Sequence, residues 1–291
     1  GRDYVLSFLG VASCLDLYVN GQYAGCSEGA HNTAEFDLSE LLHPGENELL
    51  AVVRRWCTGS YLECQDMFRN NGIFRDVLLR IDEPADLWDI DARTEKQGET
   101  YALTLCAEAA EGTRVRFTLE GPGLSRCAEA LVRNGKAQVR FEDLSVTEWN
   151  AEAPVLYNVY FETDTCCVKE RIGFRTVEIQ GDVFLLNGKK LKLKGVNHHD
   201  TSPTGGYTMS PEEIQRDLKL CKAFHIDTIR SSHYPPDPLL LELAEELGLY
   251  IIDENDLETH GVWAHRFPPN YDHISDDPKW EPRYLDRVAR L

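Results

Sequence analysis

The stretch IDTIRSSHYPPDPLLLELAEELGLYIID, residues 226–253, determines the fold class of the C-terminal third of this 291-residue chain. Its two ends, IDTIRSS and LYIID, are short apolar runs typical of buried strands. The segment between them predicts a helix that begins at Asp237 and Pro238 and ends at Gly248. The stretch therefore reads as a strand, a helix and a second strand joined by short connections.

The residues just before this stretch repeat the same pattern. LKLKGVN at 191–197 predicts another strand, and SPEEIQRDLKLCKAF at 210–224 predicts another helix. Ser210 is placed to be the N-cap of that helix, with Pro211 in its first turn and Glu213 completing a capping box. Three strands alternating with two helices, all closely connected, indicate a parallel α/β sheet within residues 181–291.

The rest of the chain predicts β-structure. Residues 1–82 and 83–180 contain short alternating or apolar runs such as CLDLYVNGQYAG and TYALTLCAEA, without a convincing amphipathic helix. Asn20–Gly21 is a strong signal for a two-residue hairpin turn. The first region predicts a β-sandwich or jelly roll, and the second a small immunoglobulin-like sandwich. The fold class is thus multidomain, β followed by α/β.

Composition excludes several classes of partner. The chain has 49 acidic and 30 basic residues and a formal net charge of −19, so it repels nucleic acids and anionic membranes. It contains nine cysteines without a CxxC pair, and no apolar run of membrane-spanning length, which together favour a cytoplasmic protein. Because its first residues already have a strand pattern, we expect the natural chain to begin before Gly1. No GxSxG, P-loop or GxGxxG motif is present.

Polar side chains follow each of the three predicted strands. They occupy 197–200 after the first strand, 230–233 after the second and 253–260 after the third. The carboxyl ends of parallel strands meet at one edge of a sheet, so we expect these groups to converge on a single rim. Acidic groups mixed with Arg and His donors suit neutral substrates rich in hydroxyl groups, such as sugars.

Glu258 and His260 stand out by their spacing. Two residues apart in an extended segment, they point to the same side and can both bind one divalent ion. A carboxylate with an imidazole at such a rim favours Mg²⁺ or Mn²⁺ over zinc. Other polar residues have alternatives: His198 fits a structural role better than ligand binding, and Arg230 could pair with Glu254 or contact the substrate.

Several long, ordered segments resemble family 2 glycoside hydrolases, and within them the bacterial β-galactosidases. They are LYVNGQYAG, EFDLSELLHPGEN and GSYLECQDMFRNNGIFRDV in the first region, EWNAEAPVLYNVYF and IGFRTVEI in the second, and FLLNGKKLKLKGVNHHD and RSSHYPPDPLLLELAEELGLYIIDENDLETHG in the third. The resemblance implies a partial sugar-binding jelly roll (1–82), an immunoglobulin-like domain (83–180) and the first three βα units of a TIM barrel (181–291).

The resemblance also implies cofactors and site residues. Glu258 and His260 resemble two ligands of an active-site magnesium ion, and Asp66 resembles a first-domain residue that contacts both the sugar and a sodium ion. His199 and His233 resemble the histidines that bind the sugar and stabilise the transition state. The implied substrate is a β-galactoside such as lactose, and the implied full-length enzyme is a homo-oligomer.

Two departures from the family pattern affect these expectations. Cys64 and Phe68 stand where many relatives have an acid and a Trp, which affects the neighbourhood of the sodium site. A retaining glycosidase needs two carboxyl groups, an acid/base and a nucleophile, and no carboxylate here matches either one. We therefore expect these 291 residues to be inactive alone, as the N-terminal part of a retaining β-galactosidase. The alternatives are a non-catalytic sugar-binding or complementing fragment and, disfavoured by ETHG, a β-glucuronidase.

Overall fold

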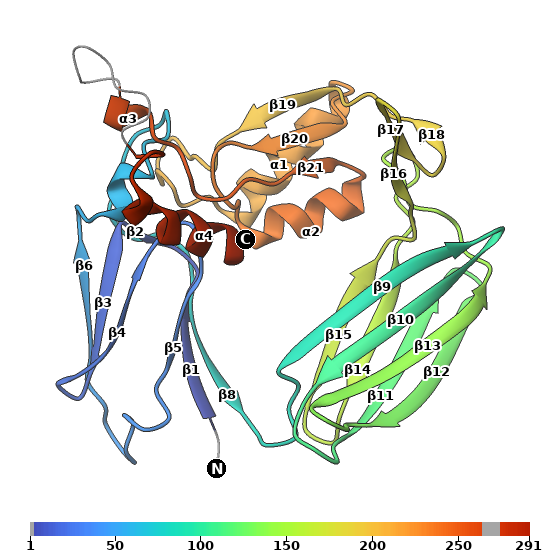
Figure 1. Cartoon of the computed structure of the whole chain (residues 1–291), viewed down its shortest axis with the longest axis horizontal. Helices are drawn as coiled ribbons and strands as arrows, with labels where there is room; N and C mark the ends of the chain where they lie inside the picture. The colour runs from blue at the N-terminus through green and yellow to red at the C-terminus, as the bar shows by residue number, and fades with distance from the viewer. Residues whose placement is uncertain (1–2, 264–273) are drawn as a thin grey trace. The chain divides into compact units, whose positions relative to one another are not determined.

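The computed structural model describes residues 3–263 and 274–291 (Figure 1). These residues divide into two compact units, here called the sandwich unit and the site unit. The sandwich unit comprises 82–194 and 243–250, and the site unit comprises 3–81, 195–242 and the described residues of 251–291.

The sandwich unit is built mainly from two antiparallel sheets. One has the strand order β13-β10-β9 and the other β12-β11-β14-β15. Both sheets contribute to one apolar core, in which Leu103 and Leu105 of β10 meet Phe117 of β11 and Phe161 of β14. The strands are β9 (Asp89–Gln97), β10 (Thr100–Glu108), β11 (Arg114–Gly121), β12 (Leu124–Leu131), β13 (Lys136–Leu144), β14 (Tyr157–Glu162) and β15 (Cys167–Ile172). Mostly β-structure is therefore confirmed for this region, while the immunoglobulin-like assignment stays a prediction.

A small antiparallel sheet follows in the same unit, with the order β16-β17-β18. Its strands are β16 (Val177–Gln180), β17 (Val183–Leu186) and β18 (Lys189–Lys190). The sequence predicted one strand over 191–197, but the strand found there is β19 (Gly195–His198). The reason is that the amide of Leu191 donates to the carbonyl of Phe184 in β17, so the chain first completes the small sheet.

The first region of the site unit, residues 3–81, contains three β-sheets. The sheets have the orders β5-β1-β8, β4-β3-β6 and β2-β7. Their strands are β1 (Asp3–Phe8), β2 (Val11–Ala12), β3 (Cys14–Val19), β4 (Gln22–Glu28), β5 (Ala34–Asp37), β6 (Leu49–Arg54), β7 (Gly72–Ile73) and β8 (Val77–Asp82), with a 3-10 helix, η1, at Gly59–Tyr61. Asn20 and Gly21 have φ values of 51° and 77° in the turn between β3 and β4, which confirms the predicted hairpin.

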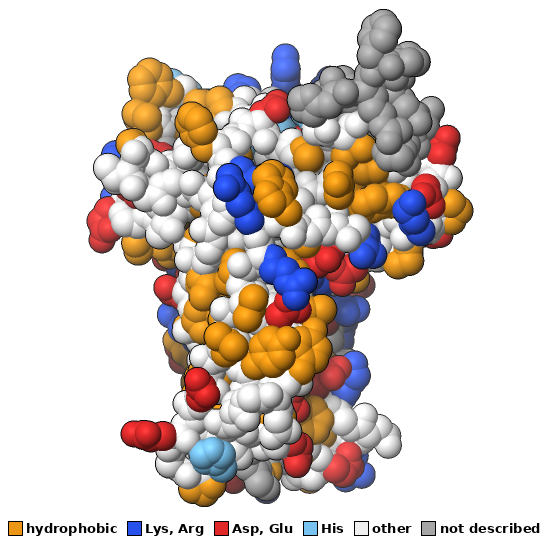
Figure 2. All heavy atoms as spheres, turned by 90° about the vertical axis from the view of Figure 1, so that its left-hand side faces the viewer, with side chains coloured by type: hydrophobic (Ala, Val, Ile, Leu, Met, Phe, Trp, Pro, Cys, Tyr) orange, Lys and Arg blue, Asp and Glu red, His pale blue; other side chains and the backbone are white. Residues whose placement is uncertain are grey.

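Successive residues of β3 face opposite sides of its sheet. Leu15, Leu17 and Val19 pack into an apolar core with residues of β1 and β5. Cys14, Asp16 and Tyr18 therefore lie on the outer face. Figure 2 views this side of the molecule and shows hydrophobic side chains gathered on it, and the exposed apolar residues of the same face include Tyr23, Leu50 and Val52.

Most of the predicted α/β segment lies in the site unit, while residues 243–250, which include the end of α2 and the first residue of β21, belong to the sandwich unit. β19, β20 (Thr228–Ser231) and β21 (Tyr250–Ile252) form one sheet in that order, and β19 and β20 are parallel. Helix α1 (Pro211–Ala223) has the predicted capping box between Ser210 and Glu213, and α2 is at Pro238–Leu247. The remaining helices are α3 (His260–Trp263), a 3-10 helix η2 (Pro278–Trp280) and α4 (Glu281–Ala289).

Candidate active site

The polar groups at the ends of β19, β20 and β21 meet around Arg230. Its Nη1 donates to Oδ1 of Asn197 at 3.3 Å, and its Nη2 lies 3.1 Å from Nδ1 of His233. The guanidinium also pairs with the carboxylate of Glu254 through Nε. The three strand ends thus converge as predicted. Of the two possible roles for Arg230, the structure shows the pairing with Glu254.

Glu258 joins this cluster to the first region of the unit. Its Oε2 lies 3.1 Å from Nε2 of His233, and its Oε1 lies 3.2 Å from Nδ1 of His260. The same nitrogen of His260 lies 3.4 Å from Oδ1 of Asp66. A continuous row of charged and imidazole groups therefore runs from His233 through Glu258 and His260 to Asp66. The side chain of Glu258 is largely shielded from solvent, whereas those of His260 and Asp66 are exposed.

Backbone hydrogen bonds between two distant segments hold Glu258 in place. Glu63 and Glu258 form an isolated parallel β-bridge. The amide of Cys64 donates to the carbonyl of Glu258 at 2.7 Å, and the amide of Glu258 donates to the carbonyl of Leu62 at 2.6 Å. Because Asp66 follows two residues after Cys64, this pairing is what brings its carboxylate to the site.

The Glu258–His260 pair has the chemistry of a hard-cation site. Ligands about 2.1 Å from one Mg²⁺ ion, in adjacent octahedral positions, lie about 3 Å apart, which matches the 3.2 Å between Oε1 and Nδ1. The sequence predicted an extended backbone from Glu258 to His260. Glu258 is extended, in its β-bridge, but His260 is already the first residue of helix α3. The two side chains meet nonetheless, so the donor set fits the ion.

His199 lies next to the same cluster. Its Nδ1 is 3.3 Å from the hydroxyl of Tyr234, and its ring is 6.2 Å from that of His233, nearly perpendicular to it. Burial lowers the pKa of His199, and the neighbouring His233 and His198 lower it further. His199 is therefore neutral near pH 7 and suited to exchange hydrogen bonds with a hydroxyl group.

His198 points into a different environment from His199. Its two ring nitrogens lie 3.6 Å from Asp200 and 3.5 Å from Asp217, a residue of α1. These contacts link the end of β19 to α1, as expected of a structural histidine. Asp253 likewise has structural contacts: it accepts hydrogen bonds from the hydroxyl of Ser231, at the end of β20, and from the amide of Glu254.

A buried charge network that we did not anticipate lies behind the site. Asp256 is fully buried and accepts hydrogen bonds from the amide of His31 at 2.9 Å and from Nε2 of Gln65 at 2.7 Å. Glu63 is also buried and accepts from Nη2 of Arg287, in α4, at 2.5 Å. Asp256 lies within the acidic stretch after β21, but its partners are more than 190 residues away in sequence. No local pattern could have identified them.

The two buried carboxyls of this network differ in protonation. Burial raises the pKa of Glu63 to about 8, and the nearby Asp256 adds to the rise while Arg287 opposes it. Burial acts in the same direction on Asp256, but its contacts with His31 outweigh that effect and lower its pKa. Asp256 therefore holds the negative charge near pH 7, and Glu63 holds a proton.

Tyr234 and Arg75 complete the support for the rim. The amide of Asp200 donates to the hydroxyl of Tyr234 at 2.8 Å, and the ring of Tyr234 stacks on His31 at 3.8 Å. Nη2 of Arg75 donates to Oδ2 of Asp200 at 3.1 Å and to the carbonyl of Pro235 at 3.0 Å. These contacts fix the chain on both sides of His199 and His233.

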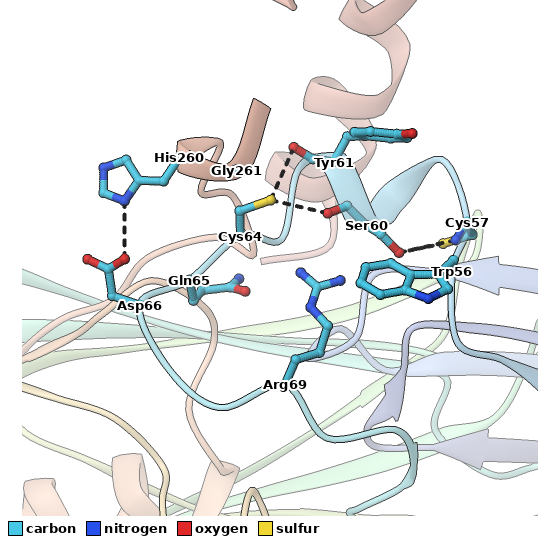
Figure 3. Close-up of a pocket in the computed structure, with 10 residues that line it drawn as sticks. All are labelled: Trp56, Cys57, Ser60, Tyr61, Cys64, Gln65, Asp66, Arg69, His260 and Gly261. Carbon is cyan, nitrogen blue, oxygen red and sulfur yellow. Dashed lines mark hydrogen bonds and ion pairs between the residues drawn. The ribbon is translucent and has the colours of Figure 1, made fainter. Parts of the chain in front are cut away.

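A pocket of about 650 Å³ opens beside Asp66 and His260 (Figure 3). Figure 3 shows the ring of Trp56 with the guanidinium of Arg69 near it, and the two are 5.2 Å apart. The remaining lining residues are Cys57, Ser60, Tyr61, Cys64, Gln65 and Gly261. An aromatic ring beside polar groups is a combination that can stack against a sugar ring and bind its hydroxyls.

Comparison with protein families identifies the chain. Residues 2–84 match the sugar-binding domain of glycosyl hydrolases family 2, and residues 177–291 match the TIM-barrel domain of the same family. The chain belongs to glycosyl hydrolases family 2.

Curated relatives of the chain include bacterial β-galactosidases. The chain is 40% identical to a β-galactosidase of Actinobacillus pleuropneumoniae, over 90% of this chain and 26% of the relative. It is 34% identical to a β-galactosidase of Staphylococcus xylosus, over 98% of this chain and 29% of the relative. The chain thus spans little more than a quarter of the length of these relatives.

Similar solved structures support the fold. A β-D-glucuronidase of Dictyoglomus thermophilum superposes with a TM-score of 0.80 at 21% identity, over all of this chain and 54% of that one. A β-glycosidase of Bacteroides vulgatus has a TM-score of 0.78 at 22% identity, over 99% of this chain and 38% of that one.

No helix in the described part of this chain is long and apolar enough to cross a membrane.

Proposed function

We propose that this chain forms the sugar-binding side of the active site of a retaining β-galactosidase. The observation that carries the proposal is the row of groups formed by His233, Glu258, His260 and Asp66, in which neighbouring members lie 3.1–3.4 Å apart. It joins the rim of the α/β segment to the sugar-binding region. Both matched family domains thus contribute side chains to one site, as expected where a sugar is held between them.

In this proposal the row holds the cations. Glu258 and His260 would bind Mg²⁺ or Mn²⁺, and Asp66 would supply a carboxylate to Na⁺ as well as to the sugar. When bound, a divalent ion would supply positive charge that stabilises negative charge on nearby oxygens. Glu258 is the central residue because it faces His233 with one carboxylate oxygen and His260 with the other.

The neighbouring side chains would bind the sugar. His199, neutral and half-buried, can donate to or accept from a hydroxyl. His233 is held by Arg230 and Glu254 at Nδ1 and by Glu258 at Nε2, so its ring orientation is fixed before substrate arrives. In this proposal a sugar oxygen would replace the Glu258 carboxylate at Nε2, and a donor oriented in advance stabilises charge that develops in the transition state without a reorganisation cost.

Charge at the site favours a galactoside over a glucuronide. A glucuronide carries a carboxylate, which needs a cationic side chain to pair with it. The charge of Arg230 is already neutralised by Glu254, so it is poorly placed to compensate. The curated relatives are named β-galactosidases, while similar solved structures include β-glucuronidases. A β-glucuronidase is therefore the second candidate.

The proposal extends to features of the full-length enzyme. The substrates would be terminal β-galactosides such as lactose, the assembly a homo-oligomer and the location the cytoplasm. The first region would be a jelly roll and the second an immunoglobulin-like domain. The two catalytic carboxyls would come from residues outside these 291, so these residues alone would not hydrolyse the substrate. A non-catalytic sugar-binding or complementing fragment is the alternative.

The test uses a full-length enzyme that contains these residues. His233→Phe should lower kcat/KM for a chromogenic β-galactoside by about 100-fold or more, with little change in the urea midpoint of unfolding. His43→Phe, at an exposed position in a turn, should change neither value. Normal kcat/KM in the His233 variant, or faster hydrolysis of the matching β-glucuronide by the unmodified enzyme, would contradict the proposal.

A further inference from the structure

A second group of metal-binding side chains lies outside the sugar site. The sulfur atoms of Cys14 and Cys57 and a carboxylate oxygen of Glu28 all lie within 4.8 Å of one another. Among the described residues, 3–263 and 274–291, these three form the group of His, Cys, Asp or Glu side chains whose donor atoms all lie this close together. Both cysteines are unpaired thiols.

The fold holds these three donors on one face of a sheet. Cys14 begins β3 and is directly opposite Glu28, the last residue of β4, so their side chains share the outer face. Cys57 comes from the loop after β6. Its amide donates to the hydroxyl of Ser60 at 3.1 Å, and its thiol lies 3.8 Å from the carbonyl of Ser13. The loop thereby folds over Cys14, which is buried despite its position on the outer face.

The cover over this group is closely packed. A Cβ atom added to Gly59 would lie 3.2 Å from Oε2 of Glu28 and 2.9 Å from Nη2 of Arg287. The loop thus packs tightly against the side chains of Glu28 and Arg287. Nε of Arg283 lies 3.9 Å from Oε2 of Glu28, which is too long for a good hydrogen bond. Nη2 of Arg287, which approaches the same loop, donates to Glu63.

The donor set has the character of a site for a thiophilic divalent cation. Thiolate sulfur binds Zn²⁺ at about 2.3 Å and carboxylate oxygen at about 2.1 Å, in tetrahedral geometry. Two such sulfurs lie about 3.8 Å apart, so donors within 4.8 Å of one another would need to move by no more than about 1 Å.

We propose that Cys14, Cys57 and Glu28 form a binding site for Zn²⁺ or a similar thiophilic cation, with a fourth position open to water or an added ligand. Binding replaces the thiol protons with the metal and involves no change of oxidation state. The site is separate from the Glu258–His260 pair. Because Cys57 also lines the pocket beside Asp66, an ion here would stabilise one wall of that pocket.

The test measures metal binding by the reduced, metal-free 291-residue chain, with Co²⁺ as the probe. We expect one equivalent to produce sulfur-to-cobalt charge-transfer absorption, and Zn²⁺ to displace it. Cys14→Ser and Cys57→Ser should each weaken binding by about tenfold or more. Cys167→Ser should leave it unchanged, because it removes an exposed thiol of the adjacent Cys166–Cys167 pair in the sandwich unit.

Folding of the variants is checked by circular dichroism. Glu28→Gln provides a variant at a partly exposed position that keeps both thiols, and it should weaken Co²⁺ binding while leaving the spectrum of the fold unchanged. Two results would overturn the proposal. One is equal Co²⁺ absorption in the unmodified chain and a Cys14→Ser/Cys57→Ser double variant. The other is a Cys14–Cys57 disulfide that forms in air and is not prevented by Zn²⁺.

Discussion

Replacing Glu63 with Gln should make the chain more stable at alkaline pH and leave it unchanged at acidic pH. Glu63 is buried, and its pKa rises from an ordinary value of 4.5 to about 8, mainly through burial and then through Asp256. A carboxyl with a raised pKa in the folded state binds its proton more tightly there than in the unfolded chain. Between about pH 4.5 and 8 the unfolded chain ionises Glu63 while the folded chain still holds its proton. The stability that Glu63 contributes is therefore complete below about pH 4.5 and is lost as pH rises to about 8.

The size of the effect follows from the width of that pH range. Each pH unit within it costs up to about 1.4 kcal/mol, so Glu63 should lower the free energy of unfolding by about 2 to 3 kcal/mol between about pH 6 and pH 9. Gln retains an oxygen that can accept from Arg287 but does not ionise. The difference in free energy between the Glu63→Gln variant and the unmodified chain should therefore grow with pH by that amount.

The assay is urea unfolding followed by circular dichroism, checked for reversibility at each pH. Working above about pH 6 keeps the chain away from its isoelectric point near 4.9. Glu46→Gln, in an exposed turn, is the control and should show no pH-dependent difference. If Glu63→Gln instead becomes less stable than the unmodified chain as pH rises, Glu63 is ionised and its ion pair with Arg287 outweighs burial. The reasoning would then be refuted.

Three further substitutions test the packing, each by its urea midpoint relative to the unmodified chain. Tyr234→Phe should cost about 1 to 3 kcal/mol because the buried amide of Asp200 loses its acceptor, and an unchanged midpoint would show that water replaces the hydroxyl. Gly248→Ala should lower the free energy of unfolding by more than about 1 kcal/mol. Gly248 has φ +75°, and the added Cβ would lie 2.4 Å from the carbonyl oxygen of Ala151. An unchanged midpoint would count against this close approach. Leu103→Ala, in the fully buried core of the sandwich unit, should cost about 2 to 5 kcal/mol, and a loss below about 1 kcal/mol would indicate a core that collapses around the missing atoms.

Local sequence was enough to identify elements whose cause is local. The capping box of Ser210 and Glu213 and the hairpin at Asn20–Gly21 were both predicted and both found. Each depends on hydrogen bonds or backbone angles within a few residues, which the residue types alone determine. The strand predicted at 191–197 was misplaced because Leu191 bonds to β17, and such a competition between two sheets leaves no trace in a local pattern.

The candidate site divides in the same way. Its polar residues at the strand ends could be found from the sequence, because hydrophobic runs locate the strands and parallel strands end on one side. The sequence also determined that donors at Glu258 and His260 would be close, since they are neighbours in the chain. Their identification with a cation site came from the donor types and the family resemblance.

Only the tertiary structure decided which distant residues complete and support that site. The bridge between Glu63 and Glu258, which places Asp66, joins segments almost 200 residues apart. The burial of Asp256 with His31, and the meeting of Cys14 with Cys57, likewise depend on how separate segments pack. Burial and through-space charge set the protonation of such groups, and neither is defined until the chain has folded.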